Sequence, residues 1–449
     1  MSLASITSSP YAGKAPALGN SANYPAAVTV TAVVIRPSDQ AILVLPTGLP
    51  TFEPVGRFWH PDVEQPLQTL QEQTGIEAYV LTLIERSTDD VTYLMLSTGA
   101  VPTNAQWVRD VDHPAAALAR QHLARPLGAP VTPAWTMPGW YDDVLPWIDD
   151  QLESPRTGRP IQVRSWGLSN VLRVPTAAGA VYFKAIGHSS TITPARPDAL
   201  PLLFAHEPSF MAAISSDHPG AVVTPLAIDE KRGWMLLPDL GELLDAQPEI
   251  SVWIDALERH ARLQRSYVNR GERLLEAGCV DRRLAVLADA LDYLVGPNPA
   301  TERLDADQRA QLPQRAEELR AAIAELAAIG VPETLLHGDL HPRNIAVRDG
   351  VTLAFDWSDA ALAHPFLDLV TFIEERSPIS QDPRLMDAYL AGWAEYAAPA
   401  DLRRALTLAK EIGGLYQVMT SLYLIDHCPP LGAAGMAQGA EWWLKSLLK

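Results

Sequence analysis

The stretch that decides the fold is "LLHGDLHPRNIAVRDGVTLAFDW", residues 335–357. Two short apolar runs within it flank an Asp-Gly pair at 349–350, and these residue types tolerate the positive φ angles of a tight hairpin turn. Counting outward from the turn pairs Ile345 with Ala354 across the two strands. The stretch therefore predicts a β-hairpin, preceded by a loop that carries several polar side chains.

The open end of this hairpin brings Asn344 and Asp356 together, because cross-strand neighbours lie about 5 Å apart. Amide and carboxylate oxygens are ligands that Mg²⁺ accepts while it keeps waters and substrate phosphates as its other ligands. Asp339 precedes the hairpin on a segment that Pro342 keeps out of helical geometry. A carboxylate in such a loop can accept the proton of an attacking hydroxyl beside metal-bound phosphates.

These motifs carry a family resemblance. "HGDLHPRN" followed by "FDW" resembles the catalytic loop and metal-binding segment of aminoglycoside phosphotransferase and choline kinase-like enzymes, which are relatives of the protein kinases. The resemblance implies that Asp339 is the catalytic base and that His337 braces the loop. It further implies that Asn344 and Asp356 bind Mg²⁺ and that Asp368 is a buried acid that anchors the loop.

A cation for the nucleotide phosphates is present in "AVYFKAI", where Lys184 lies inside an apolar strand and needs a partner. "ALPLLFAHEPSFMAAI", residues 199–214, predicts a helix with Glu207 on its inward face, and Pro208 is expected to bend or break this helix in mid-course. We expect Lys184 to pair with Glu207, as the strand lysine and helix glutamate do in kinase-like folds. A snorkelling lysine and an exposed glutamate are the alternative.

Two further segments are candidates for nucleotide binding. "SWGLSNVLRV", residues 165–174, takes the place of the phosphate-covering hairpin, with Ser169 and Asn170 as its polar contacts. Because it has a single glycine, it matches neither the glycine-rich loop of the protein kinases nor a Walker sequence. "GWMLLPDLGELL" is expected to join the two lobes, with backbone groups near Leu237 and Asp239 available to the adenine.

The length of 449 residues and the distribution of strand-like and helical patterns predict several domains. The predicted segments are a flexible tail at 1–24, an α/β domain at 25–130, a helix and linker at 131–157, a small β-rich lobe at 158–240 and a large helical lobe at 241–449. The family resemblance covers the last two segments. They are expected to form a two-lobed α+β protein-kinase-like fold.

The α/β domain predicted at 25–130 resembles the Nudix fold. "LQTLQEQTGI" is similar to the helix and glycine turn of a Nudix box, and "AQWVRDVDHPAAALARQHL" is similar to the closing part of that fold. Gln68, Thr69 and Gln73 occupy positions where the box needs metal-binding or charged residues, and Glu72 alone remains. Too few carboxylates are left to coordinate the Mg²⁺ of a hydrolase. We expect a Nudix-like, non-catalytic domain that packs on the small lobe, with an unrelated α/β cap as the alternative.

Charge and cysteine content restrict the remaining classes. A net charge of −18 disfavours nucleic acid and anionic lipid as partners. Cys279 and Cys428 are the only cysteines, so neither a disulfide framework nor a cysteine metal site is expected, which suits the cytoplasm. The N-terminus lacks the pattern of an export signal, and the uncharged run at 412–425 is shorter than the ~20 residues that a bilayer requires.

The combined prediction is an ATP- and Mg²⁺-dependent kinase, with GTP as an alternative donor. It transfers the γ-phosphoryl group to a hydroxyl of an aminoglycoside, amino sugar, sugar or related alcohol, and the acidic chain suits a neutral or cationic acceptor. One rival is a nucleotide-binding pseudo-enzyme or sensor. Another is a zinc hydrolase using His337 and His341, for which no third ligand is apparent. The sequence leaves the acceptor and the oligomeric state open.

Overall fold

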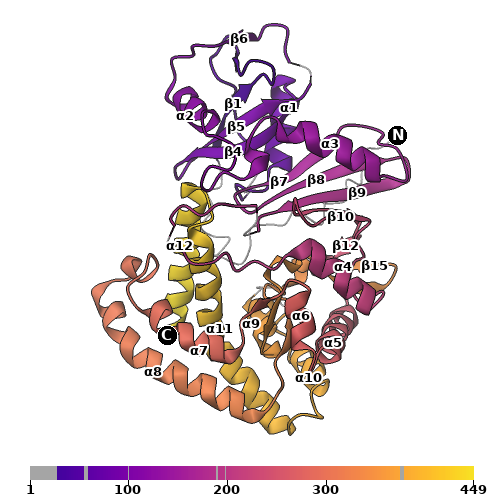
Figure 1. Ribbon diagram of the computed structural model, residues 1–449, viewed down its shortest axis with the longest axis vertical. Helices are drawn as coiled ribbons and strands as arrows, with labels where there is room; N and C mark the ends of the chain where they lie inside the picture. The colour runs from indigo at the N-terminus through magenta and orange to yellow at the C-terminus, as the bar shows by residue number, and fades with distance from the viewer. Residues whose placement is uncertain (1–27, 55–58, 100, 189–190, 198, 375–378) are drawn as a thin grey trace.

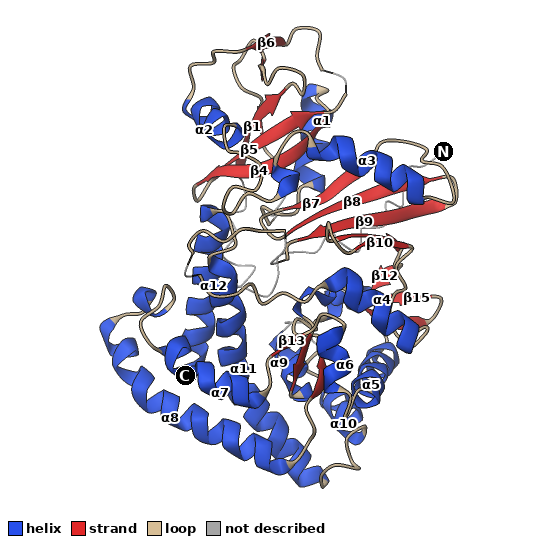
Figure 2. Cartoon of the chain, in the orientation of Figure 1, coloured by secondary structure: helices blue, strands red, loops and turns tan. Residues whose placement is uncertain are grey.

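The structure is a computed structural model that describes residues 28–449, except 55–58, 100, 189–190, 198 and 375–378. The tail predicted at 1–24 lies outside the described residues. Three parts follow one another along the longest axis of the molecule (Figure 1). We call them the N-terminal unit (28–130), the small lobe (158–240) and the large lobe (241–449). Figure 2 shows that strands dominate the first two parts and helices the third, as the sequence predicted for the two lobes.

The N-terminal unit is an α/β structure. Its described elements are β1 (Thr29–Ile35), β2 (Ile42–Val44), β3 (Thr51–Phe52), α1 (Glu64–Thr74), β4 (Ala78–Arg86), β5 (Asp90–Ser97), β6 (Gln106–Val108) and α2 (Pro114–Leu123). The sheet has the order β4-β5-β1-β2-β6, and β3 pairs with β1. β1 reads "TVTAVVI", and residues on both of its faces are buried, as in a central strand that is covered on two sides. The helix predicted from "LQTLQEQTGI" is α1, which ends at Gly75 with a φ of +73°.

The small lobe is an antiparallel sheet with one helix. Its described elements are β7 (Ile161–Ser165), β8 (Ser169–Thr176), β9 (Gly179–Ile186), α4 (Glu207–Asp217), β10 (Ala227–Asp229) and β11 (Trp234–Pro238). The strand order is β10-β11-β9-β8-β7. One sheet face packs against α3 (Trp140–Gln151), which connects the N-terminal unit to this lobe, through an aromatic cluster of Trp140, Trp147, Phe183 and Trp234. The other face turns toward the large lobe.

The helix predicted over 199–214 is shorter than expected. It begins at Glu207, so Pro208 lies in the first turn and not in mid-course. Proline is tolerated there because the first backbone N–H groups of a helix have no intrahelical acceptor. The prediction of a bent or broken helix was therefore wrong.

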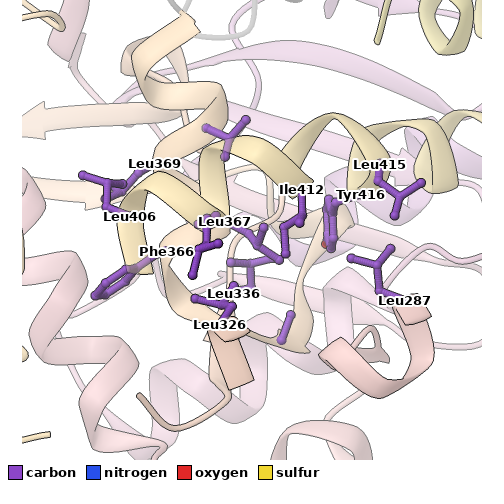
Figure 3. Packing of buried hydrophobic residues seen from close by; sticks show 14 of the residues in the cluster. Leu287, Leu326, Leu336, Phe366, Leu367, Leu369, Leu406, Ile412, Leu415 and Tyr416 are labelled. Atoms are coloured by element: carbon purple, nitrogen blue, oxygen red, sulfur yellow. The ribbon is translucent and has the colours of Figure 1, made fainter. Parts of the chain in front are cut away.

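The large lobe is mainly helical. Its helices are α5 (Ile250–Ser266), α6 (Gly271–Glu276), α7 (Leu284–Val295), α8 (Ala306–Ile329), α9 (Asp368–Glu374), α10 (Pro383–Ala391), α11 (Pro399–Ile425) and α12 (Pro430–Leu447). Its strands are β12 (Glu242–Leu243), β13 (Val280–Asp281), β14 (Thr334–Leu336), β15 (Ile345–Arg348), β16 (Val351–Ala354) and β17 (Ala361–Ala363). Figure 3 shows the core, in which Ile412 and Tyr416 of α11 pack near Leu336 and Leu367. None of the helices in the described part of the chain has the length and apolar character needed to cross a bilayer.

β15 and β16 form the predicted hairpin. Ile345 pairs with Ala354, as counting from the turn indicated. Asp349 and Gly350 have φ angles of +52° and +74°, the conformation that this turn requires. Beyond the last pair, the Phe355 N–H donates to the carbonyl of Asn344 over 2.9 Å. Asn344 and Asp356 therefore lie at the open end of the hairpin, as the strand register predicts.

Candidate active site

A cavity of about 140 Å³ lies where the three parts of the chain meet. The N-terminal unit contributes Trp59 to its wall. The small lobe contributes Arg164, Trp166, Leu168, Ser169, Lys184, Ile186 and Phe204. The large lobe contributes Asp339, His341, Arg343, Asn344, Phe355, Asp356, Ser358, Asp359, Thr371, Gln417, Thr420, Ser421, Leu424, Met436 and Trp443. The cavity thus contains every acid and amide that the sequence assigned to chemistry and metal binding.

Asp339 lies on the loop between β14 and the short turn Pro342–Asn344. Its carboxylate Oδ2 is 3.6 Å from Nε2 of His341, whose Nδ1 accepts a hydrogen bond from the Arg343 N–H over 3.2 Å. Burial opposes ionisation, but the neighbouring His341 holds the pKa of Asp339 below its ordinary value. Asp339 is therefore a carboxylate at neutral pH and is able to accept a proton.

Asp368 and His337 fix this loop. Asp368 is fully buried and accepts hydrogen bonds from the N–H groups of His337 and Gly338 over 3.0 and 2.8 Å. Nε2 of His337 donates to the carbonyl of Phe355 over 2.9 Å, and its Nδ1 accepts from the Asp339 N–H over 3.3 Å. Burial lowers the pKa of His337, which is consistent with a neutral ring that has one donor and one acceptor nitrogen. The structure thus places His337 between the loop and the end of the hairpin.

Asn344 and Asp356 meet at the open end of the hairpin. The amide nitrogen of Asn344 donates to the Asp339 carbonyl over 3.0 Å, so its amide oxygen is the atom left for a cation. Asp356 has a φ of +63°, a left-handed conformation that aspartate tolerates better than most residues. Burial opposes ionisation of Asp356, but Lys184 and Arg164 hold its pKa well below the ordinary value. The carboxylate therefore stays charged in the folded protein.

Lys184 connects the two lobes. Its side chain is 3% exposed, and its ammonium lies 2.7 Å from Glu207 and 2.6 Å from Asp356. Glu207 also accepts the Trp357 N–H over 3.0 Å, so the first residue of α4 is tied to the segment that carries the metal-binding acid. Burial disfavours the charged lysine, yet the two carboxylates raise its pKa above the ordinary value. The expected partnership with Glu207 is present, and Asp356 is an additional partner.

Ser169 and Asn170, the two predicted polar contacts of the phosphate-covering hairpin, lie on opposite faces of the sheet. Ser169 lines the cavity, and its Oγ accepts a hydrogen bond from the Trp166 indole over 2.6 Å. Asn170 points to the opposite sheet face, where its amide lies 3.4 Å from the Tyr141 hydroxyl and 3.3 Å from Ser165 Oγ. Successive side chains of a strand face opposite ways, so the two residues cannot share a ligand. The structure does not bring Asn170 to the site.

The predicted hinge residues also lie away from the cavity. Leu237 is buried in the core between the lobes, and neither it nor Asp239 is among the described residues that line the cavity. The Asp239 carbonyl accepts from Arg348 over 2.9 Å, and its carboxylate accepts from the Gly241 N–H over 3.1 Å. The carbonyl and the carboxylate of Asp239 thus have protein partners in the structure.

Several residues of the site lay beyond the sequence predictions, among them Arg164, Trp59 and Asp359. Arg164 and Trp59 were not predicted, although a charged residue inside the strand "IQVRS" was a signal for Arg164. Asp359 follows Asp356, the predicted metal-binding acid, by three residues. Its pKa is raised to about 7 by burial and by the negative charge of Asp339. The two acids of the cavity therefore ionise in different pH ranges.

The strand lysine, the helix acid and the catalytic hairpin define a kinase-like class of protein. A sequence model of the phosphotransferase enzyme family matches residues 161–404. The chain belongs to this family, which confirms the resemblance noted in the sequence, and it is a phosphotransferase that acts on hydroxyl groups of small molecules. The match begins at residue 161, so the N-terminal unit lies outside it. The Nudix-like identity of that unit stays a prediction.

Several solved structures are similar to this chain at low identity. A choline kinase from Streptococcus pneumoniae is 13% identical with a TM-score of 0.47, and the match covers 68% of this chain and 99% of that one. A choline/ethanolamine kinase family protein from Mesorhizobium loti is 17% identical with a TM-score of 0.46, and the match covers 69% of this chain and 95% of that one. A macrolide 2'-phosphotransferase from Brachybacterium faecium is 19% identical with a TM-score of 0.45, and the match covers 66% of this chain and 98% of that one. No curated protein matches the chain.

Proposed function

We propose that the chain is an ATP- and Mg²⁺-dependent kinase of a small-molecule alcohol. One observation carries this proposal: Lys184 of the small lobe meets Asp356 of the large lobe at 2.6 Å, in the same cavity that Asp339 lines. A phosphate chain bound by the lysine would therefore point its terminal group toward the carboxylate that accepts the acceptor's proton. GTP is an alternative donor, because these contacts bind the phosphates and do not distinguish adenine from guanine.

Asn344 and Asp356 suit Mg²⁺ better than Zn²⁺. They supply one amide and one carboxylate oxygen, and Mg²⁺ takes its remaining ligands from water and phosphate. Zinc needs three or four protein ligands. In the described part of the chain, no group of three or more His, Cys, Asp or Glu side chains is arranged to hold a metal. Mg²⁺, when bound, supplies positive charge against the phosphate oxygens.

The protein side chains then divide the work. Lys184 stays protonated between its two carboxylates and binds phosphate oxygens, and Glu207 keeps it in place. Asp339 accepts the hydroxyl proton as the acceptor oxygen attacks the γ-phosphorus. His337 and Asp368 hold the loop so that the Asp339 carboxylate faces the cavity. Each role is a contact or an orientation, which is what phosphoryl transfer asks of a protein.

The acceptor pocket is proposed to lie toward α11 and α12. Polar side chains of α11, Gln417, Thr420 and Ser421, face the cavity together with apolar Leu424, Met436 and Trp443. The floor of the cavity carries Asp339 and Asp359. This lining suits an alcohol that has further hydrogen-bonding groups, an apolar portion and a neutral or positive charge, a description that amino sugars and aminoglycosides meet.

We also propose that the N-terminal unit has no hydrolase activity of its own. Gln68 of α1 donates to Glu72 over 2.8 Å on the exposed helix surface, and Thr69 is buried. Glu72 is the single carboxylate of residues 67–76, which leaves a metal with too few protein ligands for diphosphate hydrolysis. The Nudix-like resemblance therefore concerns the fold and not the chemistry.

Phosphate transfer in an Asp339→Asn variant tests the kinase proposal. Mass-detected transfer from ATP to a panel of aminoglycosides, amino sugars, sugars and choline-like alcohols identifies the acceptor of the native chain. The variant should then lose about 10²–10⁴-fold in turnover, because general-base catalysis contributes that much. ADP binding should change by less than about threefold, since Asp339 does not hold the phosphates.

Asp349→Asn in the exposed hairpin turn is the matched control and should keep native turnover. Native turnover in Asp339→Asn would overturn the base assignment. ATP binding by the native chain without transfer to any alcohol in the panel would favour the sensor alternative.

A further inference from the structure

Backbone hydrogen bonds join the N-terminal unit to β7. The Val63 N–H donates to the Val163 carbonyl over 3.0 Å. The Ser165 N–H donates to the Pro61 carbonyl over 2.9 Å. The segment 61–63 therefore acts as an added edge strand, beside a strand that ends its own sheet. This pairing fixes the position of the segment relative to the small lobe.

Asp62 and Arg164 stand opposite each other between these two bonds. Nε of Arg164 donates to Oδ1 of Asp62 over 3.1 Å, and its guanidinium carbon lies 5.4 Å from the centre of the Trp59 ring. The side chains of Arg164 and Asp62 are 16% and 15% exposed. A carboxylate and an aromatic ring of the N-terminal unit thus set the direction of this guanidinium.

The guanidinium of Arg164 is directed into the catalytic cavity. The strand register pairs Arg164 with Val171 and Val171 with Lys184, so both cations project from one face of the sheet. They approach the same carboxylate: Nζ of Lys184 is 2.6 Å from Oδ1 of Asp356, and Nη1 of Arg164 is 3.9 Å from Oδ2. Both also line the cavity beside Asp339.

A second ion pair between the same two parts provides a comparison. Glu64, in the first turn of α1, accepts a hydrogen bond from Arg173 of β8, and these side chains are 20% and 19% exposed. Their burial is close to that of Asp62 and Arg164, but neither is among the described residues that line the cavity. Fastening the N-terminal unit therefore does not require an arginine that reaches the catalytic groups.

We infer that Arg164 is a second phosphate-binding cation of the active site and that Asp62 positions it from the N-terminal unit. This inference rests on the proposed nucleotide-dependent function. A guanidinium offers planar, paired N–H donors to phosphate oxygens, which the ammonium of Lys184 does not. The ligand is the phosphate chain of a nucleoside di- or triphosphate. The N-terminal unit thereby becomes part of the nucleotide site.

Calorimetric binding of ATP, ADP and adenosine to the full chain, without an acceptor, tests the inference. Arg164→Gln should weaken ATP and ADP binding by about tenfold or more, since a charge-assisted hydrogen bond is lost, and should leave adenosine binding unchanged. Arg164→Lys keeps the charge but not the planar donors and should show a smaller loss. Arg173→Gln is the matched control and should leave all three affinities within about twofold. Thermal unfolding of each variant verifies that the compared proteins are folded.

The role of Asp62 is tested through Arg164. Asp62→Ala should weaken ATP binding by roughly three- to fivefold because the guanidinium loses its orientation. Asp62→Asn keeps an oxygen acceptor and should restore most of that loss. Because Asp62 acts through Arg164, the double variant Asp62→Ala/Arg164→Gln should bind ATP no more weakly than Arg164→Gln alone.

Three results would overturn the inference while the proposed function stands. They are native ATP affinity in Arg164→Gln, equal losses in Arg164→Gln and Arg173→Gln, and additive losses in the double variant. Absence of ATP and ADP binding by the native chain would instead remove the proposed function and the inference together.

Discussion

At the scale of single residues, the two acids of the cavity floor show how surroundings set protonation. Asp339 keeps a pKa below the ordinary value because of its neighbour His341, although burial opposes this. Burial and the negative charge of Asp339 raise the pKa of Asp359 to about 7. Below a pH of about 7 the pair therefore holds a proton mainly on Asp359, and Asp339 is left free to accept one.

The raised pKa of Asp359 predicts a pH-dependent stability. A carboxyl that binds its proton more tightly when folded stabilises the protein below its unfolded pKa of about 4, and this contribution is lost as the pH rises through about 7. Asp359→Asn removes this titration. The variant should therefore gain stability relative to the native chain between pH 5 and pH 8, as measured by unfolding midpoints across that range.

Asp110, an exposed acid of the N-terminal unit, supplies the control for this measurement. Asp110→Asn should follow the native curve at every pH. Parallel stability curves for the native chain and Asp359→Asn would show that Asp359 titrates alike in the folded and unfolded states.

At the scale of elements, the glycine of the catalytic loop, Gly338, is more closely surrounded than the glycine of the hairpin turn, Gly350. Gly338 has a φ of +87°, and an added Cβ would lie 2.4 Å from the backbone oxygen of Asp359. Gly350 has a φ of +74°, but no atom lies within 4 Å of an added Cβ. The two glycines share the backbone conformation and differ in the space around them.

Alanine at these two glycines should therefore have unequal effects. Gly350→Ala should lower the free energy of unfolding by about 1 kcal/mol, the cost of a left-handed alanine. Gly338→Ala adds a backbone clash and should cost about 2–4 kcal/mol, with a parallel loss of turnover because Asp339 follows it in the chain. Denaturant unfolding gives both values. Equal losses would mean that the loop shifts easily away from Asp359.

Elements encoded by local patterns could be predicted from the sequence. The hairpin register followed from the spacing around residues 349–350, and the pairing of Lys184 with Glu207 followed from two charges placed in apolar elements. The start of α4 was missed because Pro208 permits a helix to begin one residue earlier. Asn170 was assigned to the site together with Ser169, but neighbouring residues of a strand face opposite sides of the sheet, and Asn170 lies near Tyr141.

At the scale of the whole molecule, the missed residues belong to contacts between distant segments. The ring centres of Trp59 and Trp166 lie 5.6 Å apart, although the two residues are far apart in the chain and no local pattern connects them. Arg164 follows an irregularity in the pairing of β7 with β8, between residues 162 and 164, which breaks the simple alternation of faces. The sequence predicted that the N-terminal unit packs on the small lobe, but the residues that it brings to the cavity follow only from the tertiary structure.

The same interface predicts that the N-terminal unit and the small lobe unfold together. The amide of Gln162, 1% exposed in β7, accepts from the Val80 N–H over 2.7 Å and donates to the Val80 carbonyl over 2.9 Å. It also donates to the Tyr141 hydroxyl over 2.7 Å. Gln162→Leu would leave the buried Val80 N–H without its acceptor and should lower the free energy of unfolding by about 2–4 kcal/mol.

Calorimetry of Gln162→Leu should show one transition that moves as a whole to lower temperature, because the mutated side chain connects β4 to β7. Gln311→Leu, on the exposed surface of α8, is the control and should change the midpoint little. Two separate transitions, with only the first shifted in Gln162→Leu, would show that the N-terminal unit unfolds independently. In that case the segment that carries Asp62 would leave the cavity while the two lobes stay folded. Arg164 would then lose its ion pair with Asp62 at temperatures at which the ion pair of Lys184 with Glu207 is still formed.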